Sequence, residues 1–250
     1  MTAAAIILAS LAVSGCGSST TRTAATTASS LHVASKDVAA GKLEALPTGN
    51  VFVRVIHFTQ VPGTSFGSEK HNQGVLFQAR GEQTLHVETD PPVRLQAGAG
   101  VFQPSRYHMH ENTGTSLNDW YFFAIWPSAA RGTPLVNRAA VVMYATPDVP
   151  GGALETGSYT ESIRLVTIDA RGRTGAAKYG GLLTLFVLDG SVQVHAAGQQ
   201  VTTLDKGQAI HELPGVAVQV FNHQNAPSHL VFFFATGAGQ PFETPITATP

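Results

Sequence analysis

The feature that most constrains the fold is a series of short β-type runs that occurs twice along the chain. From Val51 onward, runs of β-branched and aromatic residues such as VFVRVIHF and WYFFAIW are separated by turn residues at intervals of about ten. A second series, with runs such as LLTLFVLDG and HLVFFFA, follows a Pro- and Gly-rich stretch at residues 147–152. No long helical period lies between them. Many short strands with regular turns predict an all-β barrel or sandwich.

The two series match each other at a nearly constant offset of 109 or 110 residues. Glycines, a leucine, a proline and an asparagine recur in the same order. The matched pairs are Gly81 and Gly190, Leu95 and Leu204, Gly98 and Gly207, Pro104 and Pro214, and Asn112 and Asn222. Ordered matches at nearly one offset indicate a duplication, and hence two copies of one structural unit.

Short motifs within the repeat carry a family resemblance. The segments FQARG (77–81) and FVLDG (186–190) look like the hairpin that ends the first cupin motif. FQPSR with Asn112, and LPG with Asn222, look like the second cupin motif. Over residues 51–242 the chain therefore resembles two-domain cupins. The resemblance implies an all-β fold of two tandem cupin β-barrels, which are double-stranded β-helices of the jelly-roll type. It says little about activity, because this fold carries many functions.

The resemblance also implies a metal site in the N-terminal half. Cupins hold Fe, Mn, Ni or Zn with three histidines and a carboxylate, which suit these cations. Glu69 and His71 fall about where the first motif places its HxH pair, and the spacing back from Asn112 selects His108. His110 faces the same side as His108 if this segment is a strand, because side chains two residues apart share a face. The expected ligands of one divalent transition metal are Glu69, His71, His108 and His110. The competing interpretation is that they are polar pocket residues in a barrel that has lost its metal.

Other residues of the N-terminal half receive lesser roles. His57 and His86 lie on other predicted strands and are interpreted as barrel histidines with hydrogen-bond partners, with His86 as an additional candidate ligand. Glu69 or Glu111 is the candidate catalytic base. Large aromatic residues fill barrel interiors, so four of them are predicted to belong to the core. These are Trp120, Tyr121, Phe122 and Trp126.

The C-terminal half lacks the residues that a cupin metal site needs. Lys178, Tyr179 and Gly180 stand where the first motif would place ligands, and Val218 or Val220 replaces the histidine of the second motif. No metal is expected in this half, and its lumen is predicted to be mainly apolar. Its other histidines are interpreted as surface or rim residues, namely His195, His211, His223 and His229.

The N-terminal segment points to export. Residues 3–13 are apolar but too short to span a bilayer, as in a signal peptide. Val13, Ser14, Gly15 and Cys16 resemble the lipobox of bacterial lipoproteins, and Cys16 is the only cysteine in the chain. Lipidation of Cys16 would anchor the protein to a bacterial membrane, at the cell surface or on the periplasmic face.

These observations predict a complete domain plan. Residues 1–16 form the signal peptide, 17–45 a flexible Ser/Thr/Ala-rich tether, and 46–146 the N-terminal cupin domain. A linker at 147–160 leads to a degenerate C-terminal cupin domain at 161–242 and a tail at 243–250. The net charge is −1 and there is no basic run, which excludes nucleic acid as a partner. The sequence leaves open whether the chain forms a homo-oligomer.

Three functional hypotheses remain. The first is a lipid-anchored extracytoplasmic bicupin that binds a small molecule, with or without a metal in the N-terminal barrel. The alternative is a metal-dependent cupin enzyme, a dioxygenase or isomerase that acts on a small metabolite. The third is a structural or partner-binding lipoprotein in which neither barrel has a ligand and both lumens are filled.

Overall fold

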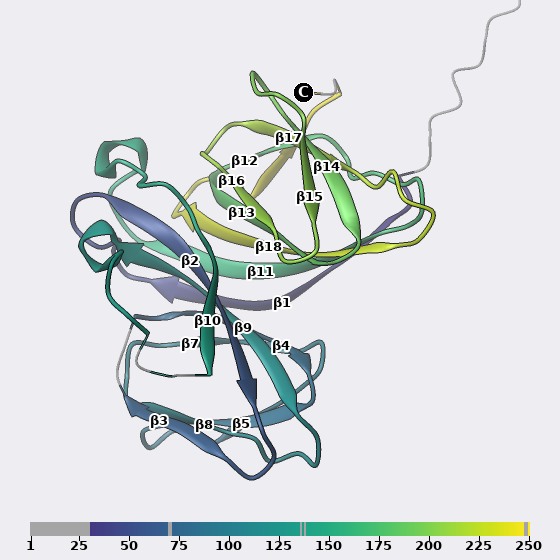
Figure 1. Cartoon of the computed structure of the whole chain (residues 1–250). Coiled ribbons are helices and arrows are strands. Elements are labelled where there is room, and N and C mark those ends of the chain that lie inside the picture. Colours follow the sequence, from purple (N-terminus) through teal and green to yellow (C-terminus); the bar gives the residue numbers. More distant parts are fainter. Residues whose placement is uncertain (1–30, 70–71, 136, 138, 248–249) are drawn as a thin grey trace, which may run out of the picture. The chain divides into compact units, whose positions relative to one another are not determined.

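The chain folds into two β-barrels, each built from an inner sheet that packs against the other barrel and an outer sheet that lies away from it (Figure 1). This computed structural model describes residues 31–69, 72–135, 137, 139–247 and 250. All strand pairs run antiparallel, as in a jelly roll. The N-terminal barrel has the inner sheet β10-β2-β9-β4-β7 and the outer sheet β3-β8-β5-β6. Its strands are β2 (Val51–Gln60), β3 (Ser65–Glu69), β4 (Gly74–Arg80), β5 (Glu82–Val87), β6 (Val93–Gln96), β7 (Gly100–Gln103), β8 (His108–Glu111), β9 (Asn118–Pro127) and β10 (Ala140–Ala145).

The C-terminal barrel repeats this plan. Its inner sheet has the order β1-β11-β18-β13-β16 and its outer sheet the order β15-β14-β17-β12-β19. Its strands are β1 (Val33–Leu43), β11 (Tyr159–Ile168), β12 (Ala177–Tyr179), β13 (Gly181–Asp189), β14 (Ser191–Ala196), β15 (Thr202–Asp205), β16 (Ala209–Glu212), β17 (Ala217–Phe221), β18 (Ser228–Gly237) and β19 (Glu243–Pro245). Short 3₁₀ turns, Ser128–Ala130 and Gly151–Ala153, lie in the connections on either side of β10.

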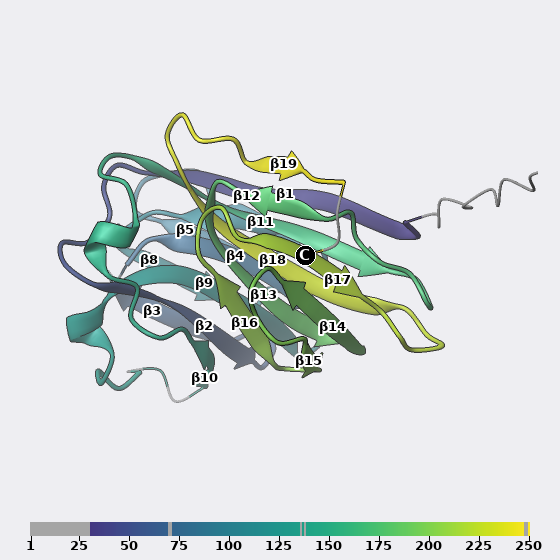
Figure 2. The same ribbon diagram turned by 90° about the horizontal axis from the view of Figure 1, so that it is seen from above.

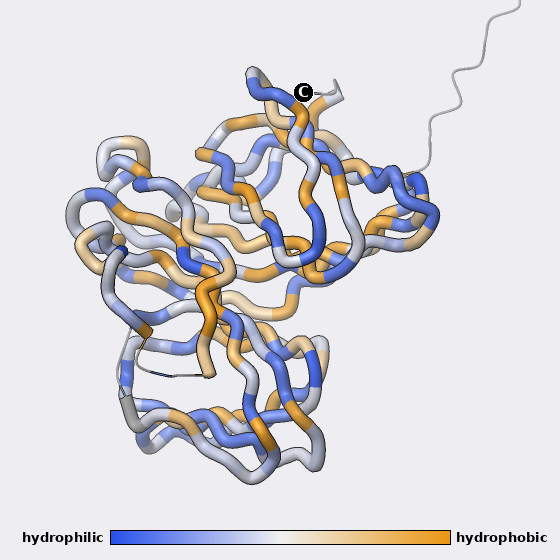
Figure 3. Tube along the Cα trace, viewed as in Figure 1, coloured by the Kyte–Doolittle hydropathy of each residue, from blue (hydrophilic) through white to orange (hydrophobic). Residues whose placement is uncertain are grey.

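A shared apolar core joins the two inner sheets. It combines residues of the N-terminal barrel such as Val53, Val55 and Phe123 with residues of the C-terminal barrel such as Phe186 and Phe233. Alternate residues of each inner strand face this core or the barrel lumen, because the side-chain period of a strand is two. Figure 1 shows the two barrels stacked, and in Figure 2, seen from above, the strands of one barrel lie over those of the other. Figure 3 shows hydrophobic segments along the strands between them.

The structure corrects the predicted tether. The sequence predicts a flexible tether over residues 17–45. Residues 17–30 lie outside the described part of the chain, but Val33–Leu43 form strand β1, which pairs with β11 along its whole length. β1 also packs against β4 and β7 of the N-terminal barrel, and Gly41 lies directly under the ring of Phe102. This segment therefore belongs to the C-terminal barrel and helps to join it to the N-terminal one.

Two further boundaries differ from the prediction. β11 begins at Tyr159, inside the predicted linker, and pairs with β18 from its first residue. Residues Glu243–Pro245 of the predicted tail form β19, which pairs with β12. Backbone pairing extends both ends of the C-terminal barrel beyond the segments that are apolar enough to stand out in the sequence.

The predicted duplication is confirmed by equivalent contacts in both barrels. The side-chain amide of Asn112 donates to the carbonyl oxygens of Gln60 (2.8 Å) and Ser116 (2.9 Å). The amide of Asn222 does the same with Ile168 (2.9 Å) and Ala226 (2.8 Å). In each barrel the asparagine thus fixes the same turn, which explains why it recurs at the repeat offset.

The signal peptide and Cys16 lie outside the described residues, so their roles stay predictions. Within the described part of the chain, no helix is long and apolar enough to cross a membrane.

Candidate metal centre

His108 and His110 lie side by side on the lumen face of β8. Both are buried, with 3% and 4% exposure, whereas the alternating residues Met109 and Glu111 are only partly buried. β8 is held between β3 and β5 in the outer sheet, where His110 pairs with Leu85 and His108 with Val87. The prediction that both imidazoles point to the same side of the strand is confirmed. Both point into the barrel lumen.

Hydrogen bonds fix the tautomer of both rings. The Nδ1 atom of His108 lies 2.8 Å from the carbonyl oxygen of Arg106, and Nδ1 of His110 lies 2.9 Å from Oε1 of Gln83. Both partners are oxygens that accept hydrogen bonds, so each Nδ1 carries the proton and donates it. Each neutral ring therefore has its lone pair on Nε2. This is the arrangement that orients histidines for metal binding.

A chain of buried amides determines the orientation of Gln83. Its Nε2 donates to Oε1 of Gln78, and Nε2 of Gln78 donates to the carbonyl oxygen of Arg80 (2.7 Å). Gln78 and Gln83 are both fully buried. Because each amide in the chain has one donor and one acceptor in use, Oε1 of Gln83 must face His110. The network thus extends the control of the His110 tautomer across three strands.

The rings themselves are held in place by packing. His110 stacks on Trp120 with 4.4 Å between ring centroids, and Trp120 stacks on Phe58 at 3.9 Å. The centroids of His108 and His110 are 5.1 Å apart and their planes are nearly perpendicular. Two imidazoles that bind one ion at about 2.1 Å place their centroids about 5 Å apart, so the observed pair fits a shared ion. Trp120 and Phe122 are buried as predicted.

The other two predicted ligands stay untested, because the side chain of Glu69 and the whole of His71 lie outside what the structure describes. The backbone of Glu69 pairs with that of His108 across β3 and β8, which brings this residue to the predicted site. His71 lies outside the described residues. Among the residues that the structure describes, no group of three His, Cys, Asp or Glu side chains could hold a metal. The described centre is thus a pair of imidazoles, and the four-ligand set stays a prediction.

Three other predictions from the N-terminal half can be judged. His86 pairs with Met109 and contacts Glu111 at 3.2 Å, so both His86 and Glu111 lie on the face of the outer sheet that points away from the lumen. The roles of His86 as a ligand and of Glu111 as a base are therefore wrong, because each is one residue out of phase with the lumen positions. His57 stacks on Tyr121 and approaches Asp119 at 3.4 Å, as expected of a histidine with partners.

The C-terminal barrel replaces this polar network with apolar residues. Val218 and Val220 stand at the positions of His108 and His110, and Val187 and Val192 at those of Gln78 and Gln83. All four belong to an apolar core that fills this lumen, as predicted. The fold therefore does not require the histidines or the glutamines. Comparison of the two halves was the sequence signal that could have identified Gln78 and Gln83.

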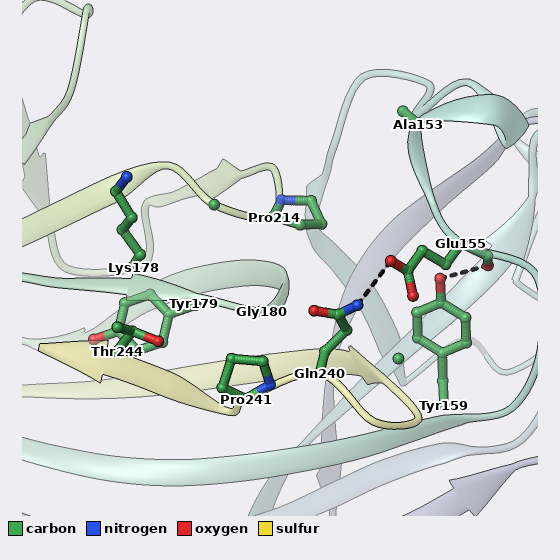
Figure 4. A pocket seen from close by; sticks show the side chains of 12 residues that line it. Ala153, Glu155, Tyr159, Lys178, Tyr179, Gly180, Pro214, Gln240, Pro241 and Thr244 are labelled. Carbon is green, nitrogen blue, oxygen red and sulfur yellow. Dashed lines mark hydrogen bonds between the residues drawn. The ribbon is translucent and has the colours of Figure 1, made fainter.

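The rim of the C-terminal barrel holds a pocket of about 410 Å³ (Figure 4). On one side Nε2 of Gln240 donates to Glu155 at 2.7 Å, and the hydroxyl of Tyr159 donates to the carbonyl oxygen of Glu155. Lys178 lies at the other end, and Tyr179, which is buried in the lumen core, also lines the pocket. No histidine is among the described residues that line it.

Comparison with known proteins identifies the fold. No protein-family model matches the chain, and no curated protein matches it in sequence. A variant of oxalate decarboxylase from Bacillus subtilis has a similar structure, with a TM-score of 0.59 and 9% identity over 82% of this chain and 79% of that one. The chain has a bicupin fold.

Two other solved structures agree with this bicupin assignment. AerE from Microcystis aeruginosa matches with a TM-score of 0.54 and 12% identity, covering 80% of this chain and 98% of its own. A formate complex of Lactobacillus farciminis oxalate decarboxylase matches with a TM-score of 0.56 and 8% identity, covering 82% and 88%. At these low sequence identities, the likeness shows a shared fold alone.

Proposed function

We propose that this bicupin is a metal-dependent enzyme whose N-terminal barrel binds one divalent transition metal through Nε2 of His108 and His110. The observation that carries the proposal is the pair of Nδ1 hydrogen bonds, which directs both Nε2 lone pairs away from the barrel wall. Glu69 and His71 are the proposed remaining ligands. The metal would supply Lewis acidity and a template for substrate.

The comparisons support an enzyme over a passive binding protein. The oxalate decarboxylases of Bacillus subtilis and Lactobacillus farciminis share the fold, and the former contains Mn(II) centres. The connected network of Gln78, Gln83 and His110 lies in the N-terminal barrel, and Val187, Val192 and Val220 take these positions in the C-terminal barrel. We therefore place the proposed active site there, and assign the C-terminal barrel a structural role.

A buried arginine supports an anionic substrate. Arg54 is 3% exposed and shares the lumen face of β2 with Ile56. Its guanidinium packs on Trp126 and donates to the carbonyl oxygens of Ala130 (3.1 Å) and Arg131 (3.0 Å). Within the described residues, its Nε has no hydrogen-bond partner and no carboxylate pairs with it. Burial, and to a smaller extent the charge of Arg131, lowers the pKa of Arg54. A buried cation of this kind favours a small carboxylate in the lumen.

The residues of the C-terminal lumen provide a matched test of the metal site. In the double variant His108→Val and His110→Val, both residues become those of the C-terminal barrel, so the variant should fold. Metal analysis of the purified full-length protein should find about one Fe, Mn, Ni or Zn ion per chain in the native protein and none in the variant. Equal metal content in both proteins would contradict the proposal.

Probe anions test the substrate class separately. Formate and oxalate should bind the metal-loaded protein, and Arg54→Met should weaken their binding at least tenfold. Arg80→Met, which removes an exposed guanidinium of the same barrel, should have little effect. Equal affinities for native protein and Arg54→Met would remove the case for an anionic substrate.

A binding protein without metal is the second candidate. It is favoured by the lack of a three-ligand group among the described residues. In that case the native protein would contain no metal after reconstitution, and divalent cations would leave its thermal stability unchanged, since a ligand that binds only the native state must stabilise it. For either candidate we propose an extracytoplasmic location with a lipid on Cys16.

A further inference from the structure

A pocket outside both lumens lies where the two barrels meet. Its volume is about 270 Å³, just below the range of about 300–1,000 Å³ that is usual for small-molecule sites. The C-terminal barrel contributes Leu43 and Glu161, and the N-terminal barrel contributes Asn72, Gln73 and Ser105. Leu46, from the segment that follows β1, also lines it.

Glu161 is the single ionisable residue among the described residues that line the pocket. It lies on β11, between Gly41 of β1 and Ala235 of β18, and is 1% exposed. The backbone N–H of Ile125 donates to its Oε1 at 3.2 Å, which links the two barrels. Its Oε2 has no hydrogen-bond partner in the described part of the chain.

The charge balance of this pocket is unusual. No Lys, Arg or His is among its described lining residues, and no ion pair involving Glu161 occurs within the described structure. An isolated buried carboxylate is costly unless a cation accompanies it. Burial raises the pKa of Glu161 to about 8, although the N–H of Ile125 opposes this rise. Near neutral pH the side chain therefore holds a proton, which a bound cation would displace.

The other walls indicate what kind of cation fits. Gln73 and Ser105 each carry an oxygen acceptor, and most of the remaining surface is formed by Leu43, Leu46 and other apolar residues. A bare metal ion would find one carboxylate and much apolar surface, which suits it poorly. An ammonium group has three donors for several acceptors, and an attached alkyl chain would cover the apolar wall.

We propose that this pocket binds a short-chain organic ammonium ion, with its nitrogen paired to Glu161 and its alkyl chain against Leu43 and Leu46. None of the described residues that line this pocket is a proposed metal ligand. Binding requires no covalent step: the ammonium enters, and the proton of Glu161 leaves to solvent.

Calorimetric titration of the full-length protein with n-butylammonium tests this site, with n-butanol and butyrate as neutral and anionic controls. We expect saturable binding of n-butylammonium at pH 7, with release of about one proton per ligand, measurable from the heats in buffers of different ionisation enthalpy. Affinity should fall at least tenfold in Glu161→Gln, which preserves the shape of the side chain. The His108→Val and His110→Val variant should bind as the native protein does.

Several results would overturn the proposal. No binding of n-butylammonium would do so directly. Equal affinity for n-butanol would show that the pocket recognises alkyl surface and not charge. Equal affinity in Glu161→Gln would place the ligand elsewhere. None of these outcomes would affect the metal centre, whose test is the metal content.

Discussion

Replacement of Glu161 by Gln should make the stability of this protein less sensitive to pH. The pKa of Glu161 rises from 4.5 to about 8 in the fold because of burial. No described basic side chain lines its pocket to offset this effect. Such a rise corresponds to about 5 kcal/mol of preference for the protonated form in the folded state. Glu161→Gln keeps the shape and the acceptor for Ile125 but cannot ionise.

The direction of the pH dependence of stability follows from how many protons the folded and unfolded states bind. Between pH 4.5 and 8 the folded protein holds a proton on Glu161 and the unfolded chain does not, so the free energy of unfolding falls as pH rises. The slope is about 1.4 kcal/mol per pH unit. Relative to Glu161→Gln, the native protein should lose about 3 kcal/mol of stability between pH 5.5 and 7.5. Below pH 4.5 the two should differ little in pH dependence.

Urea unfolding, monitored by the fluorescence of Trp120 and Trp126, measures this difference at each pH. Both proteins share every other titrating group, so subtraction isolates Glu161. Glu44→Gln removes an exposed carboxylate from the same end of β1 and should give a curve parallel to that of the native protein. Parallel curves for native protein and Glu161→Gln would refute the reasoning, because Glu161 would then be ionised in the folded state.

Three other predictions concern separate parts of the molecule. Gln83→Val installs the residue of the C-terminal lumen and removes the acceptor that fixes the tautomer of His110. It should lower metal affinity about 10- to 100-fold with little change in fold, as measured by competition with a chelator. Unchanged affinity would show that Gln83 does not orient His110 for metal binding. Gly41→Ala would place a Cβ atom 1.9 Å from the Phe102 ring, and should lower the free energy of unfolding in urea by about 1–3 kcal/mol. Gly132→Ala, which has open space around it, should lower this free energy less. Equal losses would contradict the packing of β1 against Phe102. Cys16→Ser should move the protein from the membrane fraction to the soluble fraction of the producing bacterium, and an unchanged distribution would argue against lipidation.

The strands of both barrels could be predicted because their apolar residues are local and periodic. Segments such as Val51–Gln60 and Ser228–Gly237 bury most of their side chains, so β-branched and aromatic residues dominate them. β1 could not be found this way. Its eleven residues are mostly exposed or half-buried, and its conformation depends on backbone pairing with β11, a strand more than 110 residues away. Such pairing leaves little trace in the local sequence.

Only part of the candidate site could be predicted, because the rest of it also depends on pairing between strands. The spacing of His108 and His110 determines that they share a face, and the same period should have excluded Glu111, one residue further on. Gln78 and Gln83 carried no chemical signal alone, because an amide in a strand is usually a surface residue. Their role became visible from the register, which brings Gln83 to His110 and gives Val192 the equivalent place.

The central claim is that one metal ion binds in the N-terminal barrel through Nε2 of both histidines. Anomalous X-ray diffraction from crystals grown with Mn(II), recorded on the full-length protein, tests it most directly. We predict a single strong anomalous peak within about 2.3 Å of Nε2 of His108 and His110, and none in the C-terminal lumen. A peak bound elsewhere, or no peak at saturating Mn(II), Fe(II) and Zn(II), would contradict the account.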